Sequence, residues 1–213
     1  RYCQEPSNAP DSDCNGIPRK SRNCLYIHGF NVNQNQARGW AATIFKRFWQ
    51  SGYNDLFTAV DWYGDIGQGG ITGKDSDSMD YYSGVINAFR SSKYLAEGAK
   101  KLPGEKWIFA HSLGNVVASA AIQDWGLSYT KYYLVNAAVP VQAFKPDVRH
   151  ELMVDKDCYA VHDAYRSCGW YKLFEADDFR SLLHWVNRFP KVAGNVINCY
   201  SDTDEVVGND FKS

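Results

Sequence analysis

Lys106-Trp-Ile-Phe-Ala-His-Ser-Leu-Gly-Asn-Val-Val-Ala-Ser-Ala-Ala-Ile122 decides the fold of this chain. An apolar run at 107–110 passes through a short turn into a run of small residues at 116–122, which predicts a buried strand leading into a helix. A tight strand-to-helix turn presents a serine hydroxyl above the end of a sheet, with backbone amides nearby. Ser112 is therefore the candidate nucleophile; the alternative is a structural serine at the end of a strand.

A second stretch, Cys24-Leu-Tyr-Ile-His-Gly-Phe-Asn-Val-Asn33, runs from an apolar strand into a polar loop. Gly29 lets the backbone of that loop come close to a ligand. The oxyanion that develops during acyl transfer needs hydrogen-bond donors aimed at it. We predict that the backbone amides of Phe30 and Leu113 supply them.

A third stretch, Asn195-Val-Ile-Asn-Cys-Tyr-Ser-Asp-Thr-Asp-Glu-Val-Val207, predicts a strand that ends in a loop with two aspartates. Either carboxylate could hold and polarise a histidine. Asp204 is the predicted acid and Asp202 is the alternative. Loop aspartates also form turns without any catalytic role.

In chain order, these three stretches resemble the α/β-hydrolase superfamily of serine esterases and lipases. The resemblance spans residues 23–140 and 191–207. It is closest to a bacterial branch that reads His-Gly-Tyr-Asn after the first core strand and Ala-His-Ser-Met-Gly-Asn at the serine turn. The matching segments here are His28-Gly-Phe-Asn31 and Ala110-His-Ser-Leu-Gly-Asn115.

The resemblance implies a role for each matched residue. Ser112 would be the nucleophile, Asp204 the acid, and the amides of Phe30 and Leu113 the oxyanion hole. The supporting residues would be those that shape the oxyanion loop, His28 and Gly29, together with His111, which would face away from the substrate. No metal ion or other cofactor is expected, because no Cys-x-x-Cys pair or histidine cluster with ligand spacing is present.

The triad of this superfamily places a histidine after the acid. In this sequence no histidine follows His184. We expect the catalytic histidine in a C-terminal segment beyond this sequence. The alternatives are a histidine from another chain, or one of three that precede the acid strand, namely His150, His162 and His184.

Apolar and polar runs divide the chain into four parts. They are an irregular N-terminal arm at 1–22, an α/β core at 23–140, a cap rich in aromatic residues at 141–190, and a final core strand with the acid loop at 191–213. The expected strands lie near 23–28, 56–62, 106–110, 131–136 and 195–200, and the expected helices near 35–51, 80–101 and 113–125. Strands that alternate with helices predict a parallel sheet with helices on both faces. Ligands bind at the carboxyl ends of such strands, and each candidate site residue follows one.

Composition limits the partners and the compartment. The 213 residues carry a formal charge of −1 without basic runs, which argues against nucleic acid, and no apolar stretch is long enough to span a membrane. Six cysteines favour an oxidising compartment, so the protein is expected to be secreted or periplasmic. The two local pairs, Cys3 with Cys14 and Cys158 with Cys168, are the expected disulfides. Cys24 and Cys199 are expected to be free, buried thiols.

These features predict a serine hydrolase that cleaves a small-molecule or lipid carboxylic ester through an acyl-enzyme on Ser112. Two alternatives remain. One is a hydrolase-like binding protein whose site is never completed by a histidine. The other is an acyltransferase or amidase that uses the same triad.

Overall fold

The structure is a computed structural model that describes residues 22–64, 74–139, 143–144, 188–192 and 195–201, with only the backbone for 74–83. Several parts of the predicted organisation lie outside the described residues. They are residues 1–21 of the arm, 145–187 of the cap and 202–213 of the acid loop.

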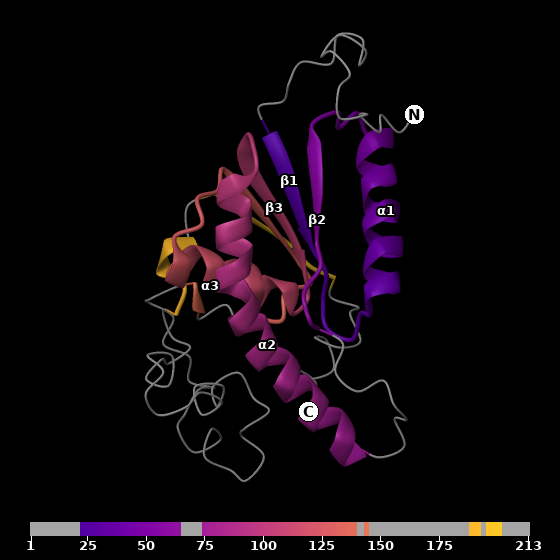
Figure 1. The fold of residues 1–213 in the computed structure, drawn as a ribbon, viewed down its shortest axis with the longest axis vertical. Helices are drawn as coiled ribbons and strands as arrows, with labels where there is room; N and C mark the ends of the chain where they lie inside the picture. Colours follow the sequence, from indigo (N-terminus) through magenta and orange to yellow (C-terminus); the bar gives the residue numbers. More distant parts are fainter. Residues whose placement is uncertain (1–21, 65–73, 140–142, 145–187, 193–194, 202–213) are drawn as a thin grey trace.

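Five parallel strands form one sheet in the order β2-β1-β3-β4-β5 (Figure 1). The strands are β1 (Arg22–Ile27), β2 (Leu56–Val60), β3 (Glu105–His111), β4 (Lys131–Val135) and β5 (Val196–Cys199). This arrangement confirms the predicted parallel α/β sheet. Because all strands run the same way, the loops after β1, β2 and β3 meet at one edge of the sheet.

Helices cover both faces of the sheet, as predicted. They are α1 (Gln34–Gln50), α2 (Lys74–Lys101) and α3 (Gly114–Trp125), with a short 3-10 helix η6 (Pro190–Val192). Figure 1 shows α1 on one side of the sheet and α2 with α3 on the other. None of the described helices is both long and apolar enough to cross a membrane.

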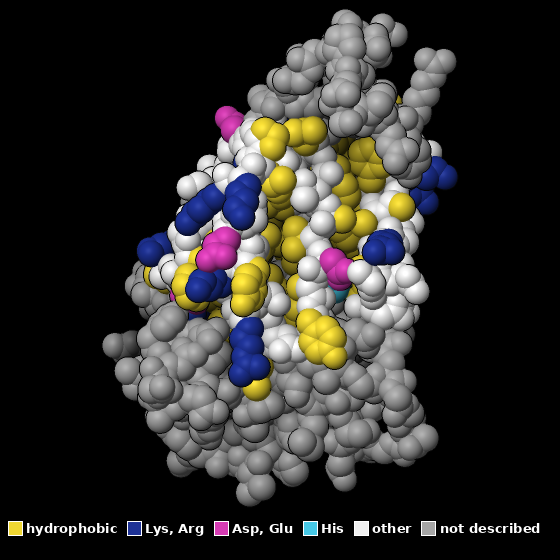
Figure 2. Space-filling view, in the orientation of Figure 1, with side chains coloured by type: hydrophobic (Ala, Val, Ile, Leu, Met, Phe, Trp, Pro, Cys, Tyr) yellow, Lys and Arg dark blue, Asp and Glu magenta, His cyan; other side chains and the backbone are white. Residues whose placement is uncertain are grey.

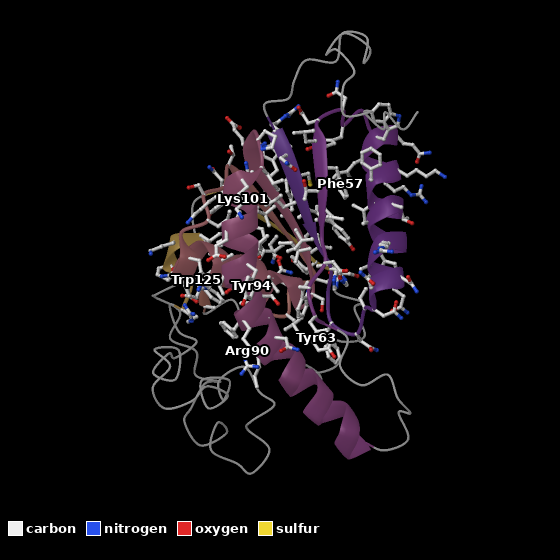
Figure 3. The ribbon with its side chains drawn as sticks, viewed as in Figure 1. Phe57, Tyr63, Arg90, Tyr94, Lys101 and Trp125 are labelled. Atoms are coloured by element: carbon white, nitrogen blue, oxygen red, sulfur yellow. The ribbon has the colours of Figure 1, made fainter. Side chains whose placement is uncertain are left out.

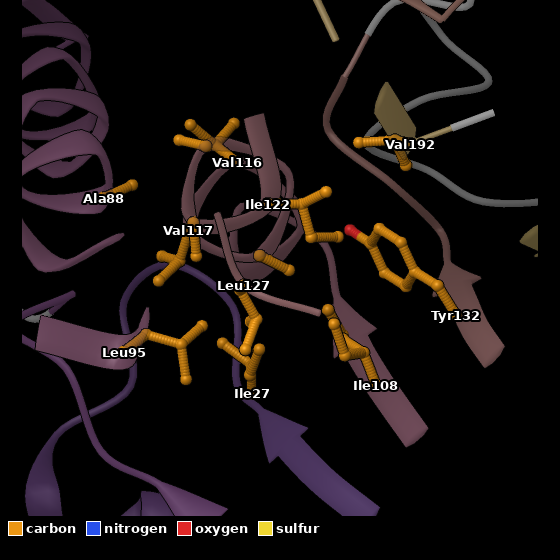
Figure 4. Packing of buried hydrophobic residues seen from close by; sticks show 14 of the residues in the cluster. Ile27, Ala88, Leu95, Ile108, Val116, Val117, Ile122, Leu127, Tyr132 and Val192 are labelled. Carbon is orange, nitrogen blue, oxygen red and sulfur yellow. The ribbon is translucent and has the colours of Figure 1, made fainter. Parts of the chain in front are cut away.

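The face under α2 and α3 is mostly aliphatic. Leu25, Ile27 and Ile108 from the strands are fully buried, as are the small residues of α3. Figure 4 shows side chains from α2, α3 and three strands converging in this cluster. Each large aliphatic side chain buried here contributes about 1.5–3 kcal/mol of transfer free energy. This face therefore holds α3, and with it the serine turn, firmly on the sheet.

The face under α1 is aromatic. Phe48 of α1 packs edge-on against Phe57 of β2 and Phe109 of β3, with ring centroids 6.0 and 5.2 Å apart. Phe57 is labelled in Figure 3, where it lies between β2 and α1. A capping box starts α1: the Asn33 side chain accepts from the backbone N–H of Gln36, and the Gln36 side chain accepts from that of Asn33.

Among the described residues, strands β2 and β5 form the two edges of the sheet. Figure 2 shows hydrophobic side chains in a strip over β2, between α2 and α1. At the other edge, Cys199 of β5 is exposed, so the expectation that it is a buried thiol is wrong. Its position on an edge strand is the reason.

Cys24 lies in the interior strand β1 and is buried and free, as predicted. Burial raises the pKa of its thiol to about 12, so the group stays protonated at neutral pH. The four cysteines of the two expected disulfides, Cys3, Cys14, Cys158 and Cys168, lie outside the described residues.

A buried ion pair joins the end of the predicted cap segment to the core. Both terminal guanidinium nitrogens of Arg188 donate to the Asp124 carboxylate of α3, at 3.0 and 2.6 Å. The guanidinium also lies 4.8 Å from the centroid of the Phe189 ring. This contact fixes where the chain enters η6 and then β5.

Candidate active site

Ser112 lies in the turn between the interior strand β3 and α3. Its φ angle is +50°, in the left-handed region that L-residues with side chains rarely adopt. The turn is held from outside, because the Ser112 N–H donates to the carbonyl of Val135 at 2.9 Å and its own carbonyl accepts from Ala138 N–H at 3.2 Å. A left-handed residue costs of order 1–3 kcal/mol and persists only where its surroundings impose it.

The side chain of Asn115 clamps this turn from within. Its Nδ2 donates to the carbonyl of Ala110 at 3.1 Å and to that of Ser112 at 2.9 Å, so one amide ties both ends of the turn together. Asn115 is fully buried, and its backbone N–H also donates to the Ser112 carbonyl, at 3.0 Å. These contacts hold Ser112 in its left-handed conformation.

Tyr132 of β4 orients that clamp. Its hydroxyl donates to Asn115 Oδ1 at 2.9 Å, and it lies 3.3 Å from the hydroxyl of Ser119 on α3. Burial raises the pKa of Tyr132, so the phenol remains protonated and able to donate. Asn115 and Tyr132 were not predicted as site residues. The motif that ends at Asn115 was the only sequence signal for either of them.

Changing Tyr132 to phenylalanine removes the hydroxyl and leaves the buried Oδ1 of Asn115 without this donor. An unsatisfied buried polar group costs about 1–3 kcal/mol, so we expect the free energy of unfolding in urea to fall by that amount. Tyr94 is 72% exposed on α2, and its change to phenylalanine is the matched control, with no measurable shift expected. Equal urea midpoints for the two variants would contradict the clamp.

The predicted oxyanion loop after β1 packs directly against the serine turn. A Cβ on Gly29 would lie 2.9 Å from Ser112 Cβ and 3.0 Å from His111 Nδ1. A Cβ on Gly114 would lie 2.4 Å from the carbonyl oxygen of His28 and 2.8 Å from that of Ile27. Only glycine at both positions allows this approach, so the structure brings the two predicted halves of the site together.

The two predicted oxyanion donors come from these adjoining segments. Leu113 is buried at the N-cap of α3, where the first backbone N–H groups of a helix have no acceptor within the helix. Phe30 follows Gly29 and is half-buried against the core under α2. The next residue, Asn31, is also left-handed, with φ +57°, and its N–H donates to the carbonyl of Gly64 at 2.9 Å. The loop is thus held by the serine turn at Gly29 and by the loop after β2 at Asn31.

His28 is a buried part of this loop. Its Nδ1–H donates to the carbonyl of Gly29 at 2.9 Å, and its Nε2 accepts from the backbone N–H of Trp62 at 3.3 Å. A third contact brings Nε2 within 3.3 Å of Asp61 Oδ1, and the ring stacks on the Trp62 indole with centroids 5.5 Å apart. The Trp62 indole N–H in turn donates to the His28 carbonyl at 2.8 Å. His28 and Trp62 therefore shape the loop.

His111 lies on the opposite side of the serine turn from α3. Its ring packs edge-on against Trp40 of α1, with centroids 6.0 Å apart, so it belongs to the α1 face of the sheet. Several predicted site residues lie outside the described residues. They are the acid Asp204, its alternative Asp202 and the three histidines of the predicted cap. Those three are His150, His162 and His184.

Comparisons of this chain with protein-family models, with curated proteins and with solved structures found no match. Its function must therefore be inferred from its own residues and their arrangement.

Proposed function

We propose that this chain is a serine hydrolase of the α/β-hydrolase type, which cleaves carboxylic esters through an acyl-enzyme on Ser112. One observation carries the proposal: a serine with φ +50° occupies the turn between an interior parallel strand and a helix, pressed against a glycine loop. A catalytic serine needs an exposed Oγ with backbone amides close by, and this strained turn suits that requirement. A serine with a purely structural role has no need of such a turn.

The proposed reaction proceeds in two steps, acylation of Ser112 and hydrolysis of the acyl-enzyme. The Ser112 hydroxyl attacks the ester carbonyl carbon and a histidine takes its proton, while the amides of Phe30 and Leu113 stabilise the oxyanion. The C–O bond to the alcohol breaks, and the histidine returns the proton to the departing oxygen. Water then attacks the acyl-enzyme in the same manner and releases the carboxylic acid together with free Ser112.

The base in this proposal is a histidine outside the described residues. His28 is fully buried, and its Nε2 accepts from Trp62, while His111 packs on the α1 face against Trp40. We therefore do not propose either histidine as the base that accepts the proton of Ser112. Asp204 is the residue proposed to fix the tautomer of the base.

Hydrolysis of p-nitrophenyl acetate and butyrate tests this assignment. Changing Asp204 to asparagine should lower kcat by up to about 10⁴-fold, because an amide stabilises the wrong tautomer of the histidine. Asp202→Asn is the matched control and should turn over like the wild-type chain. A loss confined to Asp202→Asn would show that the acid is misassigned. The assay uses the full-length protein, so that the proposed histidine is present. A full-length wild-type protein that hydrolyses neither ester would contradict the esterase proposal and favour a binding protein.

A further inference from the structure

A cavity lies beside the predicted oxyanion loop, at the carboxyl end of β2. Its volume is about 560 Å³, within the range of small-molecule sites. Its walls are the start of α1 and the loop after β2, and the lining residues are Val32, Asn33, Gln34, Asn35, Asp61, Trp62 and Tyr63. The next residue, Gly64, accepts the N–H of Asn31, so the cavity adjoins the loop that packs on Ser112.

The polar groups of this cavity suit a neutral ligand with hydroxyl groups. Asp61 supplies a carboxylate that only accepts hydrogen bonds when ionised. Its Oδ1 lies 3.3 Å from His28 Nε2, and its side chain is 46% exposed, which leaves room for a ligand to contact it. The exposed side-chain amides of Gln34 and Asn35 both donate and accept. A hydroxyl group also does both, so it can donate to Asp61 and accept from an amide. Because no lining residue is basic and one is acidic, an anion is disfavoured.

An aromatic ring completes the cavity. Tyr63 lines the cavity, and its side chain is 67% exposed. Figure 3 shows Tyr63 between α2 and the start of α1. A sugar ring has apolar C–H faces and a rim of hydroxyl groups. One exposed aromatic face beside a carboxylate and amides matches both features.

We propose that this cavity binds a sugar ring, so that the natural substrate is an acylated carbohydrate whose ester group reaches Ser112. The cleavage part rests on the proposed function above, whereas sugar binding at this cavity does not. The 28–31 loop would connect the two parts of this site, because it packs on Ser112 through Gly29 and bonds to Gly64, next to the cavity, through Asn31.

Sugar binding can be measured without catalysis. The full chain with Ser112→Ala is labelled with ¹⁵N and titrated with methyl β-D-glucopyranoside, methyl β-D-xylopyranoside and methyl β-D-galactopyranoside. We expect saturable shifts of the backbone amides of Gln34, Asn35 and Tyr63 with at least one of these glycosides. Tyr63→Ala should weaken that binding about tenfold, which corresponds to 1.4 kcal/mol. Tyr94→Ala, which removes an equally exposed tyrosine outside the cavity, should leave it unchanged.

Two outcomes would overturn the inference. One is the absence of saturable shifts with all three glycosides. The other is saturable shifts at these same amides with 1-hexanol but with no glycoside, which would make the cavity an acyl-chain site. If Ser112 reacts as a nucleophile but no glycoside binds, the sugar inference fails while the proposed hydrolase stands. If a glycoside binds but Ser112 is unreactive, the hydrolase proposal fails and the sugar site stands.

Discussion

Replacing Ser112 with alanine is expected to lower kcat for ester hydrolysis about 10⁶-fold, as removal of a triad nucleophile does. The fold should survive, because the contacts that hold the turn use the backbone of residue 112 rather than its hydroxyl. They are its N–H to Val135 and its carbonyl to Asn115. The free energy of unfolding should therefore stay within about 0.5 kcal/mol of the wild-type value.

The measurement pairs kcat for p-nitrophenyl butyrate with a urea unfolding curve for each variant. Ser51→Ala is the control, since Ser51 is an exposed residue at the C-cap of α1 and its variant should keep full activity. If the Ser112→Ala variant kept a substantial fraction of the wild-type activity, Ser112 would not be the nucleophile. If it lost activity only because it unfolded, the urea curve would reveal that.

Replacing Gly114 with alanine is expected to destabilise the protein by about 3 kcal/mol, at the upper end of typical overpacking. The new Cβ would lie 2.4 Å from the carbonyl oxygen of His28 and 2.8 Å from that of Ile27. Both atoms belong to the backbone at the end of β1, so neither can turn aside as a flexible side chain could. The substitution must push α3 away from the sheet, and we expect esterase activity to fall as the serine turn leaves the oxyanion loop.

Gly98→Ala is the matched control for this prediction. Gly98 lies in α2, and a Cβ added there meets nothing within 4 Å. Alanine has a higher helix propensity than glycine, so this variant should gain up to about 1 kcal/mol. Opposite signs for the two variants in urea unfolding are therefore expected. A neutral or stabilising Gly114→Ala would mean that α3 does not press on β1 as described.

The strands were predictable to within about two residues because each is an apolar run bounded by polar or turn residues. The helix predicted to begin near residue 80 begins earlier, because α2 starts at Lys74. The segment Lys74-Asp-Ser-Asp-Ser-Met-Asp80 has almost no apolar residues and so gives no helical period. The prediction for Cys199 gives the correct strand, but the residue is exposed and not buried. The sequence does not tell which strand forms an edge of the sheet.

The site was only partly accessible to sequence reasoning. Short motifs drew attention to Gly29, Ser112 and Leu113, because these residues lie at two turns that each follow an apolar strand. Their catalytic roles stay predictions. The link from Asn115 to Tyr132 joins residues 17 positions apart, across α3 and into β4, and no local pattern encodes it. The stacking of His28 on Trp62 depends on the pairing of β1 with β2. Asp61 and Trp62 directly follow a strand, and their place at its carboxyl end was the signal that could have drawn attention to them.

The most direct test of the central claim is the intact mass of the purified protein before and after treatment with a fluorophosphonate, which captures activated serines. The account predicts one adduct per chain, mapped by peptide sequencing to Ser112 and absent from Ser112→Ala. Ser51→Ala should still be labelled at Ser112. The absence of an adduct on the folded full-length wild-type protein, or an adduct on another serine, would contradict the assignment of Ser112 as the nucleophile.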